Sequence, residues 1–251
     1  MNQIELYRIK PFFDWWRRKQ AFINSLDLSE QRYEANALLY TSLDALSNHW
    51  AKSIRKGKYD KSGKRIIFNA FLASYGGDIF KLVSLPDVWH RVTQGEVSKL
   101  PMDVSVFLRA IGGCKATSAL YEYEDDLDMD AYTTRSISDD LSLDDIVNQT
   151  LTSSPNAIQS QLEEWLVYSQ YGAIVYKQLR NAYIHEGQPG KRTHDFKLCD
   201  WEEKPTYRSS VYGTPPVMGF SVEFMLGVLK QCIDEFEAEA LKLQIDPAPS
   251  K

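Results

Sequence analysis

Apolar side chains recur every three or four positions in three long stretches of the chain, which is the spacing of an amphipathic helix. The first stretch follows Ser29, a residue placed to act as its N-cap. Its apolar stripe consists of Ala35, Leu39, Leu43, Leu46 and Trp50. This stripe predicts a helix of about six turns. A second helix is predicted over residues 65–77, where Gly76 and Gly77 indicate the C-terminal cap.

A longer periodic segment follows a Ser-Pro-Asn start signal at residues 154–156. Its apolar face consists of Trp165, Tyr168, Gly172, Val175, Leu179 and Tyr183. The last helix is predicted to begin at Ser221, and its apolar face consists of Met225, Val228, Leu229, Cys232, Ile233, Phe236 and Ala240. Residues 78–121 predict further short helices. Residues 196–220 are rich in Pro, Tyr and Ser, and predict a long loop or a small hairpin.

Together these elements predict a mainly all-α protein with one helical domain over residues 29–245. We expect a short N-terminal arm at residues 1–28, because Pro11 interrupts it. An acidic insertion is expected at about residues 122–150, and a disordered tail at residues 246–251.

The arm carries Trp15 and Trp16 next to three cationic residues. These rings could stack on nucleic-acid bases or on a partner. Aromatic side chains of this size usually bury, so we expect them to dock the arm onto the domain.

Composition describes an ordinary globular chain, since 43% of its 251 residues are hydrophobic and 12% are aromatic. No apolar run is long enough to span a bilayer, and the N-terminal residues lack the apolar core of a signal peptide. We therefore expect a cytoplasmic protein without a membrane partner. The three cysteines, Cys114, Cys199 and Cys232, are isolated, so the sequence predicts neither a disulfide framework nor a CxxC metal site.

Charge is unevenly distributed although the net charge is only −5. Residues 52–65 hold seven basic residues against Asp60, and residues 122–145 hold ten acidic residues against Arg135. The basic stretch predicts either a phosphate-binding edge or a solvated helix hairpin. Its candidate RNA contacts are Lys56, Lys58, Lys61, Lys64 and Arg65.

The acidic stretch begins like a calcium-binding loop, with Asp126, Asp128 and Asp130 alternating. Its sixth position is Ala131 where the sharp turn needs Gly, and its twelfth is Ile137 where a Glu should chelate. The EF-hand interpretation therefore fails. A solvated or partner-facing segment is expected, with a looser carboxylate site for magnesium as the alternative.

The strongest chemical signal is the combination of Arg180, Asn181 and His185 just before a loop containing Gly187, Pro189 and Gly190. Arginine offers a planar fork for phosphate, and histidine exchanges protons near neutral pH. Requiring Asn directly after Arg makes the pattern far rarer, on composition alone, than a bare Arg–His pair.

This segment resembles the Arg-Asn-xxx-His signature of the HEPN superfamily, whose members include metal-independent ribonucleases of toxin, antiphage and RNA-processing systems. Residues 38–52 resemble the first helix of such bundles. The resemblance covers roughly residues 29–245 and implies a HEPN-like helical bundle that needs no metal or cofactor. It implies an endoribonuclease acting as a toxin or antiphage effector, with an RNA substrate and an antitoxin or regulatory protein as a partner.

Helix geometry restricts how these residues can cooperate. Asn181 and His185 share one helical face, but Arg180 and His185 are roughly 140° apart around a regular helix. Either the helix loosens at His185, or a second copy supplies its own motif. The resemblance favours a homodimer in which two motifs form one composite cleft.

In that cleft, one imidazole would deprotonate a ribose 2′-hydroxyl and the other would protonate the leaving 5′-oxygen. Arg180 would stabilise charge on the phosphate, and Asn181 would orient His185 or the phosphate. The resemblance implies products with a cyclic phosphate and a 5′-hydroxyl. The helix C-terminus and Glu186 should both favour protonated His185.

Other interpretations stay open. Lys191 and Arg192 are candidate contacts to RNA phosphates. His194 and Asp195 could join His185 in a site that needs no dimer, and His49 could be a second imidazole, although a helix-edge histidine is more often structural.

Two further alternatives concern the whole motif. A HEPN-like module could bind RNA, a nucleotide or a protein without cutting anything. Finally, the motif could simply end a core helix, with Arg180 paired to a carboxylate and His185 capping carbonyls.

Overall fold

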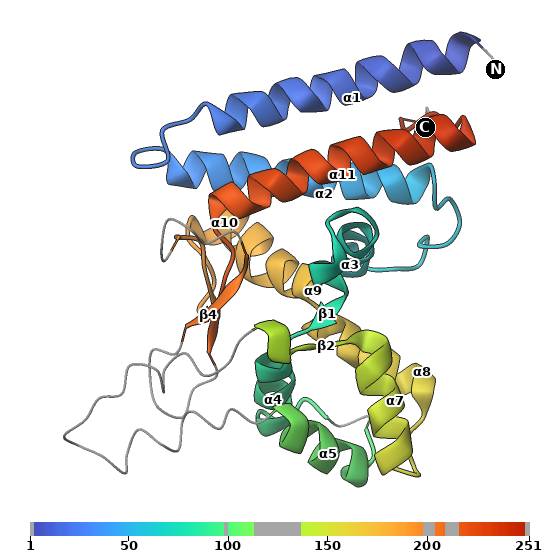
Figure 1. The fold of residues 1–251 in the computed structure, drawn as a ribbon, viewed down its shortest axis with the longest axis vertical. Helices are drawn as coiled ribbons and strands as arrows, with labels where there is room; N and C mark the ends of the chain where they lie inside the picture. Colours follow the sequence, from blue (N-terminus) through green and yellow to red (C-terminus); the bar gives the residue numbers. More distant parts are fainter. Residues whose placement is uncertain (1–2, 98–99, 113–136, 198–203, 209–215, 249–251) are drawn as a thin grey trace.

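The computed structural model describes residues 3–97, 100–112, 137–197, 204–208 and 216–248. Of these described residues, 68% are helical and 6% are in strands, which confirms the predicted all-α class. Figure 1 shows two groups of helices, a larger bundle and a smaller group below it, with a small sheet at one side. None of the described helices is both long and apolar enough to cross a membrane.

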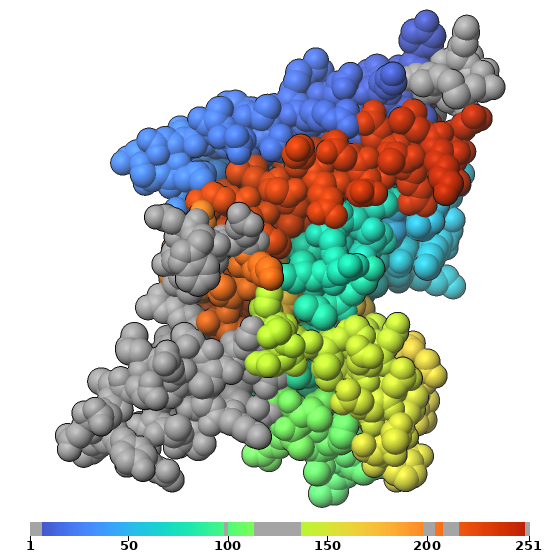
Figure 2. All heavy atoms as spheres, viewed as in Figure 1, coloured from blue at the N-terminus to red at the C-terminus, as the bar shows by residue number. Residues whose placement is uncertain are grey.

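Four long helices build the larger bundle: α1 (Gln3–Asn24), α2 (Arg32–Lys52), α3 (Lys64–Tyr75) and α11 (Val222–Leu243). Helix α1 packs along α11, and α2 packs against both α3 and α11. Figure 2 shows the atoms of α1 and α11 lying against each other on the surface. Helix α1 begins and α11 ends at the same end of the bundle (Figure 1).

The segment expected to be an arm is helix α1 of this bundle. Four of its apolar residues, Ile9, Phe13, Trp16 and Ile23, are buried. Burying four such side chains contributes roughly 1.5–3 kcal/mol each, which outweighs the roughly 3 kcal/mol cost of Pro11 inside the helix. Trp16 is therefore a docking residue, as expected, whereas Trp15 is 45% exposed, contrary to the expectation.

Helix α2 starts at Arg32 rather than after Ser29. The serine is used in the preceding turn, where its N–H and hydroxyl both donate to Asp27 Oδ1. All five apolar residues of the predicted stripe are buried, which confirms the core face of this helix. Helix α3 and its end at Gly76 also match the prediction.

The long periodic segment is interrupted rather than continuous. It consists of α8 (Gln159–Leu166), the 3-10 turn η4 (Val167–Ser169), α9 (Tyr171–Val175), the π-helical turn η5 (Tyr176–Arg180) and α10 (Asn181–Glu186). Ser154, expected to start a helix, instead ends α7 (Leu143–Ser153). The predicted stop after the motif is confirmed, because Gly187 has φ of 72° and ends α10 in the left-handed conformation.

The smaller group packs α4 (Leu85–Thr93), α5 (Met102–Gly112), α7 and α8 around a second apolar core. Strand β1 (Leu82–Val83) pairs antiparallel with β2 (Leu141–Ser142) where the two groups meet. The η1 turn (Asp78–Lys81) precedes β1, and the η3 turn (Ile137–Asp139) precedes β2.

Most of the predicted acidic insertion, including the calcium-loop test and Arg135, lies outside the described residues. Its last part does not behave as a solvated insertion. Ile146 and Val147 of α7 are buried in the second core. Asp140 is also buried, and it accepts hydrogen bonds from the Leu85 N–H (3.0 Å) and the Tyr171 hydroxyl (2.6 Å), so it links α4 to α9.

The hairpin expected before the last helix is part of a three-stranded sheet of β3 (Thr193–His194), β4 (Thr206–Arg208) and β5 (Val217–Gly219). Strand β5 lies in the middle, antiparallel to β4 and parallel to β3. Ser221 caps α11 by accepting the Phe224 N–H at 3.2 Å, and the predicted apolar face of α11 is buried throughout.

The expected disordered tail is wrong for residues 246–248. Asp246 forms an ion pair with Arg8 of α1 at 2.7 Å. His49 of α2 hydrogen bonds to the backbone of Pro247. These contacts hold the end of the chain against α1 and α2.

Candidate functional site

Arg180 stands at the junction between η5 and α10. The Asn181 N–H donates to the Tyr176 carbonyl, five residues back, which is the wide bond of a π-helical turn. Such turns occur mostly as single bulges inside α-helices, frequently at functional sites. The Arg180 guanidinium stacks over the Tyr176 ring, 5.3 Å from its centroid. The motif therefore begins at an irregularity that the sequence pattern did not predict.

Asp44 of α2 holds the Arg180 guanidinium. Arg180 Nη2 donates to Asp44 Oδ2 at 2.8 Å, and Nη1 donates to Asn181 Oδ1 at 2.9 Å. The two paired side chains are only 17% and 13% exposed. Arg180 Nε and Asp44 Oδ1 are buried without a hydrogen-bond partner among the described residues. Buried polar atoms usually have a hydrogen-bond partner, so these two are exceptions.

Sequence analysis missed Asp44. One signal was present, because Asp44 is the only acidic residue between Ala35 and Lys52, in the middle of an apolar stripe. A carboxylate at such a position usually has a buried cationic or hydrogen-bonding partner. Its partner is 136 residues away in the chain, so only the fold could identify it.

His185 lies near the end of α10 and is exposed to solvent. The residues from Asn181 to Glu186 keep α-helical geometry, so the helix does not loosen at His185. The wide turn lies before Arg180 instead. Arg180 and His185 therefore remain roughly 140° apart, with Arg180 directed toward α2 and His185 toward solvent.

The alternative site of His185, His194 and Asp195 is not supported. The Asp195 carboxylate is buried and accepts hydrogen bonds from Asn36 Nδ2 (2.8 Å) and from the Tyr183 hydroxyl. His194 is also buried, and its ring stacks on Phe196 at 4.2 Å. Because both groups are enclosed while His185 faces solvent, they do not present one reactive surface.

The same contacts tie the motif to the core. Tyr183 lies two residues before His185, and its ring stacks on Tyr40 of α2 with 6.0 Å between centroids. Burial, with added effects of its hydrogen bond to Asp195, raises the pKa of the Tyr183 hydroxyl well above its usual range. Tyr183 therefore stays a neutral hydrogen-bond donor at physiological pH. Its buried position favours core packing over base stacking.

The basic stretch lies away from the motif. Lys56, Lys58, Lys61 and Lys64 are exposed in and beside the connection between α2 and α3. Asp44 is eight residues from the end of α2, so this connection begins about 12 Å beyond it along the helix axis. In one copy the lysines and the Arg180 guanidinium do not share a pocket.

Arg65 was expected to contact RNA, but its guanidinium is bonded within the protein. Its Nη2 donates to the Tyr168 carbonyl at 2.7 Å, and its Nε donates to the Ala173 carbonyl at 2.9 Å. Arg65 therefore fastens α3 to the η4–α9 connection. It does not extend from the lysine-rich connection into solvent.

The remaining candidates are placed as follows. Lys191 is exposed, whereas Arg192 Nη1 donates to Asp87 Oδ1 of α4 at 2.6 Å. His49 packs against the Phe12 ring at 5.0 Å, and burial lowers its pKa, so it is a structural histidine rather than a second imidazole near the motif.

Comparison with protein-family models, with curated proteins and with solved structures finds no match.

Proposed function

We propose that this protein is a metal-independent endoribonuclease of HEPN type whose site consists of Arg180, Asn181 and His185. The observation that carries the proposal is a guanidinium held in place by Asp44 and Asn181 at the start of α10, with an exposed imidazole near its end. Asp44 acts as a positioning residue. It fixes the direction of the Arg180 fork before a phosphate arrives.

The proposed reaction uses two copies of the chain. His185 of one copy removes the proton of a ribose 2′-hydroxyl, and the 2′-oxygen attacks phosphorus. The bond from phosphorus to the 5′-oxygen breaks, and His185 of the other copy gives this oxygen its proton. Arg180 stabilises the negative charge on the non-bridging oxygens. The products are a 2′,3′-cyclic phosphate and a 5′-hydroxyl.

Two features support pairing of two copies. Within one copy, α-helical geometry directs Arg180 and His185 to different sides, so a single motif does not surround a phosphate. Around α10, three large apolar side chains are exposed: Tyr33, Ile184 and Phe196. Tyr33 lies close to the end of α10, because its ring is 3.6 Å from the position of a Cβ on Gly187. Exposed apolar residues beside a reactive group favour an interface there.

The test is cleavage of total cellular RNA and of a tRNA pool by purified protein in excess EDTA, with end-group analysis of the fragments. Replacing Arg180 or His185 by alanine should abolish cleavage while the fold is retained. Arg18→Ala, on the exposed face of α1, is the matched control and should cut normally. If the wild type cuts nothing, alone or after co-purifying partners are removed, the enzyme proposal is wrong.

The second candidate function is a HEPN-like module that binds RNA, a nucleotide or a partner protein without cleavage. The observation in its favour is the Arg180–Asp44 ion pair, because Asp44 already neutralises the positive charge that would stabilise the phosphate during cleavage. This function predicts RNA binding by the wild type with no cleavage. In the toxin or antiphage role, an antitoxin or regulatory protein would cover the exposed face of α10.

A further inference from the structure

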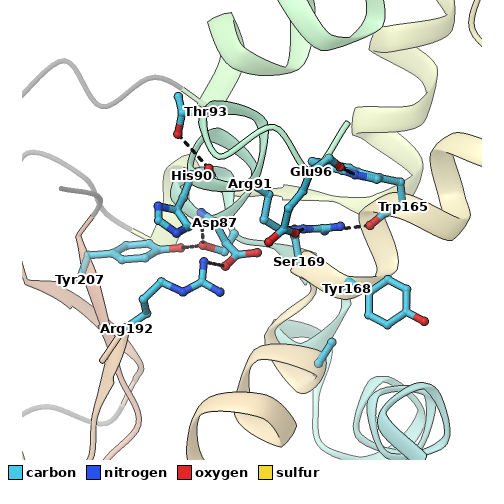
Figure 3. A network of polar contacts seen from close by, with 12 residues as sticks. Asp87, His90, Arg91, Thr93, Glu96, Trp165, Tyr168, Ser169, Arg192 and Tyr207 are labelled. Carbon is cyan, nitrogen blue, oxygen red and sulfur yellow. Dashed lines mark hydrogen bonds and ion pairs between the residues drawn. The ribbon is translucent and has the colours of Figure 1, made fainter. Parts of the chain in front are cut away.

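A second group of basic side chains lies where the bundle meets the smaller helix group. Figure 3 shows His90 and Arg91 of α4, with Arg192 approaching Asp87 from the segment before β3. Arg65 of α3 belongs to the same group, because its guanidinium (4.9 Å) and that of Arg91 (6.0 Å) both lie near the centroid of the Tyr168 ring. Lys177 of η5 lies near Arg192, because the carbonyl of the next residue, Gln178, accepts hydrogen bonds from the Gly190 N–H (2.6 Å) and the Thr193 hydroxyl (3.4 Å). We call these five basic residues, Arg65, His90, Arg91, Lys177 and Arg192, the seam cluster.

Positive charge exceeds negative charge in the seam cluster. Four permanent cations face two carboxylates, Asp87 and Glu96, which pair with Arg192 (2.6 Å) and Arg91 (2.9 Å). Arg65 donates to backbone carbonyls, and these carry no net charge. Lys177 forms no ion pair with a carboxylate among the described residues. Glu164 lines the cavity beside Arg91 and adds a third carboxylate, so the cluster is one negative charge short of balance.

The pKa values of the cluster reflect this shortage. Burial lowers the pKa of Lys177, and the nearby charges of Arg192 and Arg65 lower it further. Burial also lowers the pKa of His90, again with a contribution from Arg192. Burial would raise the pKa of Glu96, but its hydrogen bond with Arg91 and the charges of Arg91, Lys177 and Arg192 together lower it. An additional anion between these groups would relieve the repulsion.

The deeper arginines are held rigidly. Arg91 is 8% exposed, and its Nη1 donates to the Trp165 carbonyl (2.9 Å) and to Ser169 Oγ (2.8 Å). Its guanidinium lies 3.9 Å from the centroid of the Trp165 ring. A cavity of about 500 Å³ opens beside Arg91, and its other lining residues are Gln161, Glu164, Trp165 and Tyr168. Fixed cations beside a cavity lose little freedom when an anion binds.

We propose that the seam cluster is a binding site for a phosphate group. Lys177 and Arg192 make the contact at the surface, and Arg65 and Arg91 supply positive potential from behind. The phosphate could belong to a free nucleotide or to an RNA strand, since both present the same charged oxygens. The site does not depend on the proposed cleavage, because it shares no residue with the Arg180–His185 motif.

Its position suggests a consequence for the motif. Lys177 lies on η5, and Arg180 is the last residue of the same π-helical turn. A phosphate bound to both Lys177 and Arg192 would restrict the movement of this turn. The seam cluster would then steady the segment that carries Arg180.

Lys177→Ala is the variant of choice, because an exposed lysine can be shortened without opening the core. The matched control is Lys10→Ala, an exposed lysine on α1 that belongs to neither proposed site. All proteins carry His185→Ala, so that RNA stays intact during the measurement. Circular dichroism and thermal unfolding should show that both variants fold like their parent.

Binding is measured by calorimetric titration with pyrophosphate, with a mixture of nucleoside triphosphates and with a 12-nucleotide RNA. Loss of one charge-assisted hydrogen bond should weaken binding about tenfold in Lys177→Ala and leave binding by Lys10→Ala unchanged. Tight binding of the small phosphates identifies a nucleotide site, and binding of RNA alone identifies a strand contact. If none of the three ligands binds, or if both lysine variants bind like the parent, the proposal is wrong and the cluster is a structural joint.

The outcome is independent of the cleavage experiment. If the protein binds phosphate through Lys177 but cuts no RNA, the seam-cluster proposal stands and the endoribonuclease proposal is wrong. If the protein with intact His185 cuts RNA but no phosphate binds at the seam cluster, the endoribonuclease proposal stands and the seam-cluster proposal is wrong.

Discussion

Replacing Asp44 by asparagine or alanine tests whether the Arg180–Asp44 pair fixes the motif to α2. The pair is 2.8 Å long, and its side chains are 17% and 13% exposed. Exposed pairs contribute at most about 1 kcal/mol, whereas removing one partner of a buried pair costs roughly 3–5 kcal/mol. Asparagine keeps an oxygen for Arg180 Nη2, so we expect a loss of about 2 kcal/mol for Asp44→Asn and about 3 kcal/mol for Asp44→Ala.

Thermal unfolding measures this loss directly. In a chain of this size, 1 kcal/mol corresponds to a change in Tm of roughly 2–4 °C, so Asp44→Ala should lower the Tm by about 6–12 °C. A double-mutant cycle with Arg180→Ala separates the pair from other effects. The double variant should cost at least about 1 kcal/mol less than the sum of the single variants, because no charge is then left unpaired. Strict additivity, or a loss below about 0.5 kcal/mol, would refute the reasoning.

Other expected outcomes concern the core and the pH dependence of stability. Gly219→Ala should lower the Tm markedly, because a Cβ there would lie 2.1 Å from the His194 ring; its control, Gly227→Ala in α11, meets no atom within 4 Å and should raise stability by up to about 1 kcal/mol. Equal effects of the two glycine substitutions would contradict the close packing of β3 on β5. Tyr183→Phe should cost about 1–3 kcal/mol in urea unfolding, since the Asp195 carboxylate loses a buried donor, and no measurable loss would mean that water replaces the hydroxyl. Burial lowers the pKa of His49 below 6.5, so the unfolded chain binds more protons than the folded one in this range. Stability should therefore be complete above pH 6.5 and fall as the pH drops below it, and His49→Gln should reduce this fall when unfolding is followed between pH 7.5 and 5.5.

Local sequence determined the helices whose pattern is regular. The buried faces of α2 and α11 follow from spacing alone, because a helix repeats every 3.6 residues wherever it lies in a protein. Gly76 and Gly187 end their helices as predicted, because glycine or proline limits a helix through its own backbone. The position of the Arg-Asn-xxx-His motif at the end of a helix is likewise a local property.

Tertiary structure decided the rest. Pro11 predicted a break, but burial of the apolar face of α1 against α2 and α11 outweighs its cost. The Ser29 hydroxyl donates to Asp27 and does not cap α2. The π-helical turn η5 interrupts a pattern that predicted one regular helix, and spacing alone contains no signal for it.

The candidate sites show the same division. Sequence named Arg180, Asn181 and His185, because the three residues lie within six positions of one another. It could not name Asp44, nor could it bring Lys177 next to Arg192 and Asp87, because these residues come from different elements. A charge finds its partner through the fold, since electrostatic interactions depend on distance in space and not on separation along the chain.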